Sequence, residues 1–82
     1  MPIEFNVDNN QMNIMRRMME SGEGVRFLKE SDDKKDPQGG EIIATHTDSR
    51  GNKWIARSGE KELNPAQKDM ARQILEWMAI QG

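Results

Sequence analysis

Basic and aromatic side chains gather in residues 50–57, a stretch whose residue types predict a β-hairpin. Arg50 and Lys53 lie at its predicted tip, Trp54 follows directly, and Arg57 comes further along the same predicted strand. A basic hairpin with an exposed tryptophan can contact phosphates and stack on a base. By strand parity Lys53 and Arg57 share one face. The alternative is a solvated strand face with Trp54 packed in the core.

Methionines are the second unusual group. Four of the seven fall within eight residues of one predicted helix, at Met12, Met15, Met18 and Met19. Methionine is flexible and polarizable, fills irregular gaps in cores, and is frequent at binding surfaces. One interpretation is core packing. The other is that the apolar arc is too wide for one sheet to cover, so that Met18 with Ile14 faces a partner or a second copy.

The candidate residues for catalysis are few. The chain has one histidine, His46, and no cysteine, which excludes Cys-based zinc sites, thiol chemistry and a multi-histidine metal site within one chain. No phosphate-binding glycine loop, metalloprotease motif or nucleophile elbow is present. The acidic pair Asp32–Asp33 lies in a polar stretch beside lysines, which does not hold the geometry that catalysis needs. We predict no catalytic residue, no metal, no cofactor and no enzymatic activity.

The elements that position these residues follow from the apolar pattern. Alternating apolar residues predict a short strand over 3–7. Asp8 followed by Gln11 is typical of a helix start, and the apolar spacing predicts a helix over about 9–20. Glycines in residues 21–24 end that helix.

The residue types in the middle of the chain predict strands. Residues 25–30 predict a second strand, and residues 41–47 and 52–58 predict a hairpin closed by a turn with a left-handed glycine at Gly51. Between them, residues 31–40 contain no apolar side chain, which predicts a mobile polar loop.

Asn64–Pro65 is typical of a helix start, and the apolar spacing predicts a last helix to the C-terminal end of the sequence, with Leu63 packing back before the cap. The order β-α-β-β-β-α predicts an α+β fold in a single small domain over 1–82. We expect an antiparallel sheet of three or four strands packed by two helices.

Length and charge narrow the function classes. The chain has 82 residues, 34% of them hydrophobic, and a formal net charge of −2. This length allows one domain, and no apolar run is long enough to span a bilayer. The net charge shows neither the basic surplus usual for nucleic-acid binding nor a heavy acidic surplus. We expect a soluble cytoplasmic protein with no secretory signal and no membrane partner.

Together these features favour a non-enzymatic module that binds and modulates or inhibits a larger protein. Proteins of this size without cysteine are common among phage and mobile-element accessory proteins, including inhibitors of host enzymes. Two alternatives stay open: a nucleic-acid-binding domain that uses the basic hairpin, and a self-associating structural or assembly protein, such as a homodimer. The predicted partner-binding residues are Arg16, Arg17, Met18, Arg50, Lys53, Trp54 and Arg57.

Overall fold

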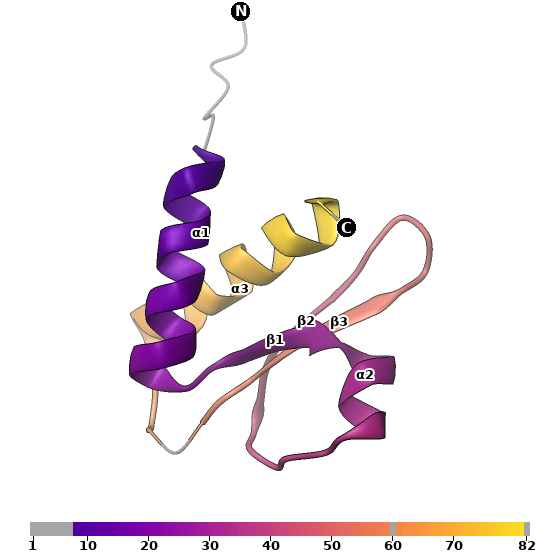
Figure 1. Cartoon of the computed structure of the whole chain (residues 1–82), viewed down its shortest axis with the longest axis horizontal. Coiled ribbons are helices and arrows are strands. Elements are labelled where there is room, and N and C mark those ends of the chain that lie inside the picture. Colours follow the sequence, from indigo (N-terminus) through magenta and orange to yellow (C-terminus); the bar gives the residue numbers. More distant parts are fainter. Residues whose placement is uncertain (1–7, 60, 82) are drawn as a thin grey trace, which may run out of the picture.

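The computed structural model describes residues 8–59 and 61–81. In chain order the elements are helix α1 (Asn9–Met18), a π-helical turn η1 (Met19–Glu23), strand β1 (Arg26–Lys29), helix α2 (Glu30–Lys35), strands β2 (Ile42–Thr47) and β3 (Lys53–Arg57), and helix α3 (Pro65–Gln81) (Figure 1). The predicted strand over 3–7 lies outside the described residues.

The strands form one antiparallel sheet in the order β1-β3-β2. In the central strand, Ile55 lies opposite Leu28 of β1 and Thr45 of β2. One register irregularity between Ile42 and Ala44 marks the start of β2. The sheet and its helices confirm the predicted α+β class, with three antiparallel strands in the described part of the chain.

Helices α1 and α3 lie on one side of the sheet, and α2 lies on the other (Figure 1). The main core fills the side of α1 and α3, where half-buried Phe27 and Trp54 of the sheet pack against the buried cluster. A hydrogen bond of 2.9 Å from Trp77 Nε1 to Asn9 Oδ1 ties the end of α3 to the start of α1. The buried residues of this core are Met12, Met19, Val25, Ala56, Leu63, Ala71, Ile74 and Leu75.

On the opposite side of the sheet, α2 packs over β1 and β3, and the sequence predicts a loop in this segment. That expectation is corrected over residues 31–35, and residues 37–40 have no regular secondary structure. The helix has the sequence ESDDKK, so no apolar periodicity reveals it. Its acidic residues come first and its lysines last, the arrangement that the helix dipole favours. Beneath it, Ile55 is fully buried.

The residues that the sequence indicates as helix starts and stops lie at helix ends in the structure. Asp8 Oδ1 accepts a hydrogen bond of 3.0 Å from the Asn10 N–H. Asn64 and Gln67 cap α3 reciprocally, each side chain accepting from the other's backbone N–H at 2.8 and 2.9 Å. The first helix continues past Met18 as the π-helical turn, which ends at Gly24 with a left-handed φ of 69°.

Candidate partner-binding surfaces

Helix α1 divides its apolar residues between the core and the surface. Met12 and Met19 are 5% and 4% exposed, whereas Ile14 and Met18 are 56% and 65% exposed. At 100° per residue, the two exposed side chains lie on a face well away from the two buried ones. Of the two interpretations that the sequence leaves open, core packing therefore holds for Met12 and Met19, whereas Ile14 and Met18 lie uncovered on the surface of α1.

The exposed Met18 borders an open groove between the end of α1, the turn η1 and the start of α3. This groove has a volume of about 510 Å³. Its residues are Met15, Met18, Met19, Ser21, Gly22, Glu23, Gln67 and Met70. We call it the methionine groove. Met70 comes from α3, and the apolar spacing of that helix does not indicate that Met70 lies at a groove with α1.

The two arginines of α1 have different surroundings. Arg16 is half-buried, pairs with Glu20 one turn later, and lies 3.4 Å from Asn13 Oδ1 through Nη2. Arg17 is exposed beside Met18 and lies one turn after Ile14. Arg17 therefore borders the exposed apolar residues, whereas Arg16 is held within its own helix.

Asp48 organises the tip of the hairpin. Its Oδ1 accepts hydrogen bonds of 2.9 Å from the backbone N–H groups of Arg50 and Asn52. Its Oδ2 accepts from Trp54 Nε1 at 3.1 Å. Hydrogen bonds to the charged form, the largest from Trp54, lower the pKa of the Asp48 carboxyl from 3.8 to about 2. Gly51 has a φ of 86°, as the predicted turn requires.

Trp54 is half-buried rather than an exposed stacking platform. Its ring packs against the core, its N–H is bonded to Asp48, and Lys29 Nζ lies 5.4 Å from the ring centroid. Arg50 is exposed at the hairpin tip. Of these predicted contact residues, Arg50 is therefore the more accessible.

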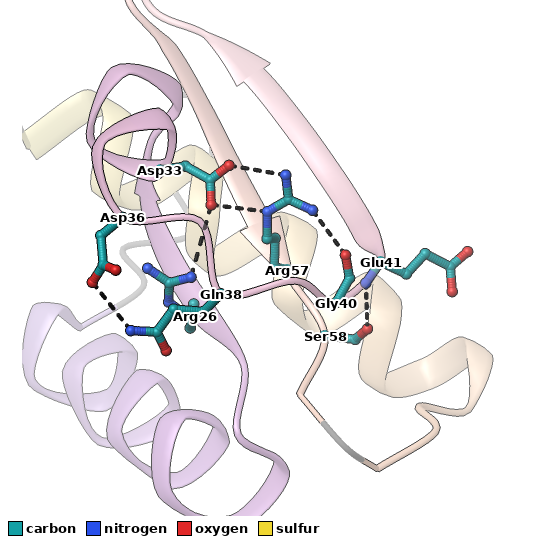
Figure 2. Close-up of polar contacts among 8 residues, drawn as sticks. All are labelled: Arg26, Asp33, Asp36, Gln38, Gly40, Glu41, Arg57 and Ser58. Atoms are coloured by element: carbon teal, nitrogen blue, oxygen red, sulfur yellow. Dashed lines mark hydrogen bonds and ion pairs between the residues drawn. The ribbon is translucent and has the colours of Figure 1, made fainter.

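Arg57 is the centre of a polar cluster between α2 and the sheet (Figure 2). Its Nε and Nη2 donate to the two carboxylate oxygens of Asp33, each at 2.9 Å, and its Nη1 donates to the Gly40 carbonyl at 2.8 Å. Arg26 Nη1 lies 3.8 Å from Asp33 Oδ1. The bond with Arg57 is the main reason that the pKa of Asp33 is lowered, and it raises the pKa of Arg57.

Lys53 faces the same helix. Its Nζ lies 3.2 Å from Glu30 Oε2, and this contact lowers the pKa of the Glu30 carboxyl. Because Lys53 and Arg57 both contact carboxylates of α2, the prediction that they share one face is confirmed. Their charges, however, are paired within the fold.

The seven predicted contact residues do not form one surface. Arg17 and Met18 lie on α1, Arg50 lies at the hairpin tip and Lys53 lies on β3, and these four are exposed, although Lys53 is also paired with Glu30. The other three contact neighbours within the fold: Arg16, Trp54 and Arg57.

His46 is half-buried and borders a hollow of about 250 Å³ between the hairpin tip and the end of α3. Asp48, Arg50 and Ile80 also line this hollow. Both oxygens of Asp48 accept hydrogen bonds from the turn and from Trp54. The carboxylate next to His46 in this hollow therefore has a structural role in the turn.

Within residues 8–59 and 61–81, no group of three or more His, Cys, Asp or Glu side chains is placed to hold a metal ion. No helix in this same part of the chain combines the length and the apolar content needed to cross a membrane. No protein-family model, curated protein or solved structure matches the chain.

Proposed function

We propose that this protein is a small binding module whose methionine groove receives apolar side chains of a larger protein partner and so modulates that partner without catalysis. The observation that carries the proposal is the exposure of Met18 at this groove, with the exposed side chain of Ile14 one turn earlier on α1. Covering a side chain of this size stabilises a complex by about 1.5–3 kcal/mol before the costs of association.

The composition of the groove supports a protein partner. Met15, Met18 and Met70 are unbranched, so they adapt their shape to an inserted side chain. Polar groups of Glu23 and Gln67 lie at the same groove. An apolar centre with polar groups around it is the usual anatomy of a protein interface.

A second candidate function rests on the lysines near the hairpin. Lys29, Lys34 and Lys53 line one hollow of about 270 Å³, and Arg50 lies at the adjacent tip. This basic surface favours an anionic partner such as a nucleic acid. Glu30 pairs with two of the lysines, which reduces the local positive charge. The groove is therefore the better supported surface.

Capture from a lysate of the source cells tests both candidates with three tagged proteins: wild type, Met18→Lys and the control Gln73→Lys, which adds the same charge at an exposed position of α3. We expect one protein to co-purify in stoichiometric amount with wild type and with the control, and to stay bound in high salt. The same protein should be absent from the capture with Met18→Lys. A photoreactive residue at position 18 should then crosslink to that protein. If Met18→Lys captures this protein as well as wild type does, the proposed role of the methionine groove is wrong. Nucleic acid that is released as salt rises, and lost in Arg50→Ala, would support the second candidate.

A further inference from the structure

The two edges of the sheet differ in how they are protected. Strand β1 carries Arg26 and Lys29 and continues directly into α2. Strand β2 has the sequence IIATHT, with no lysine, arginine, carboxylate or proline. Exposed edges are usually protected by charge, proline or bulges, because they otherwise pair with another strand. The irregularity at the start of β2 lies before Ala44 and leaves the rest of the strand in regular register.

The backbone of β2 offers hydrogen-bonding groups on its outer side. The Asp48 N–H donates to the Asn52 carbonyl at 2.9 Å, so this pair is bonded across the hairpin. In an antiparallel pair, bonded and non-bonded positions alternate. Thr45 and Thr47 therefore direct their N–H and C=O groups away from β3. Since β2 ends the strand order of the described sheet, no described strand meets these groups.

The side chains at this edge also suit pairing. Thr45 and Thr47 are exposed, and Ile42 is 44% exposed. Isoleucine and threonine are β-branched and favour strands. The edge thus combines outward backbone groups with exposed side chains that pack well across a strand pair.

We propose that a second copy of this chain pairs with β2 in antiparallel orientation about a two-fold axis, joining two sheets into one. A two-fold axis sets a strand against itself, so its own charges face each other. In β2 this brings no like charges together. In β1 the same pairing sets Arg26 against Lys29 of the second copy, which disfavours that edge. The odd-numbered residues Thr45 and Thr47 then exchange backbone hydrogen bonds with the same residues of the second copy.

Sedimentation equilibrium of the full chain, from micromolar to millimolar concentration, tests the proposal. Wild type should approach the mass of a dimer as concentration rises. Thr45→Lys should weaken association at least about tenfold, because both copies bring a lysine to opposite or diagonal positions. Mixing Thr45→Lys with Thr45→Glu should restore association, which a merely misfolded variant would not do. Backbone amide exchange at Thr45 and Thr47 should slow as the wild type dimerises.

Two controls separate this edge from the methionine groove. Gln73→Lys and Met18→Lys should both dimerise like wild type, since neither residue lies on β2. A wild type that stays monomeric at millimolar concentration would overturn the proposal. A Thr45→Lys protein that dimerises like wild type would also overturn it. Loss of the dimer in Met18→Lys would overturn it as well, and would assign self-association to the methionine groove.

Discussion

The two faces of β3 bury their side chains by different means. Ala56 and Ile55 are both fully buried and adjacent in sequence. Ala56 belongs to a core of methionines, isoleucine and leucine supplied largely by α1 and α3. Ile55 lies on the side of α2, a helix with no apolar residue, which is held to the sheet by Asp33–Arg57 and Glu30–Lys53. A short charged helix can therefore complete a small sheet where the chain has few apolar residues left.

The two faces of the sheet also differ in how strongly a single substitution should destabilise them. The core beside α1 and α3 contains many buried side chains. When a substitution shortens one of them, its neighbours can fill part of the space. The other face depends on Asp33, which is 4% exposed and lies near both Arg57 and Arg26. Removing one partner of such a group leaves the other charges poorly solvated.

The largest expected effect is Ile74→Ala, on a fully buried residue of α3. The variant should lose about 2–5 kcal/mol of unfolding free energy, since it removes buried methylenes and leaves a cavity. Ile55→Ala should lose less, because the short helix α2 can settle onto the smaller side chain. Urea unfolding of both variants measures the difference. Equal losses would show that α2 packs as rigidly as the two longer helices.

The next effect is Asp33→Ala, which removes the carboxylate that Arg57 binds through two nitrogens. The urea midpoint should fall, and amides of α2 should exchange faster while those of α3 change little. The matched control is Asp32→Ala in the same helix, whose carboxylate is 60% exposed and lies 4.0 Å from Lys35. The control should behave like wild type. A similar fall in both variants would contradict the specific role of Asp33.

A smaller effect concerns pH and the hairpin. The pKa of Asp48 is lowered from 3.8 to about 2 in the folded protein, so its stabilising contribution is full above pH 3.8 and is lost as pH falls toward about 2. The lowered pKa of Asp33 acts in the same direction. Unfolding free energy should therefore drop across this window. Asp48→Asn should be less stable at neutral pH and should show a shallower drop, measured by urea unfolding at each pH. An unchanged slope would contradict this role.

The smallest effect is Glu30→Gln, which weakens the contact with half-exposed Lys53. Partly exposed ion pairs contribute little and are screened by salt. The variant should be slightly less stable than wild type at low salt and equal to it at high salt. A large loss that salt does not change would show that this pair, like Asp33–Arg57, acts as a buried contact.

The apolar pattern explains why part of this structure was predictable. The spacing of Met12 to Met19 placed α1, Asn64–Pro65 placed the start of α3, and the hairpin was placed by its turn residues and β-branched strands. Helix α2 has no apolar residue, so hydrophobic periodicity could not reveal it. Its only signal was the order of acidic and basic residues, which a polar loop can also show.

Some features of the candidate surfaces can likewise be predicted from the sequence, and others cannot. Strand parity predicts that Lys53 and Arg57 share a face. The apolar arc of α1 leaves two interpretations open, core packing and an uncovered face at Met18 and Ile14, and exposure in the structure divides the arc between them. The pairing of Lys53 and Arg57 could not be predicted, since their partners Glu30 and Asp33 come from the segment that reads as a loop. Met70 reaches the groove because α3 crosses the end of α1, which is a tertiary property.

The hydrogen bonds of the two tryptophans give the molecule separate optical reporters. Trp54 Nε1 bonds to Asp48 within the hairpin, and Trp77 Nε1 bonds to Asn9 across α1 and α3. Because the chain contains no tyrosine, indole emission dominates its intrinsic fluorescence. A Trp77→Phe protein therefore reports on the hairpin, and a Trp54→Phe protein reports on the contact between the two helices. Stopped-flow refolding of this pair can time the two regions separately.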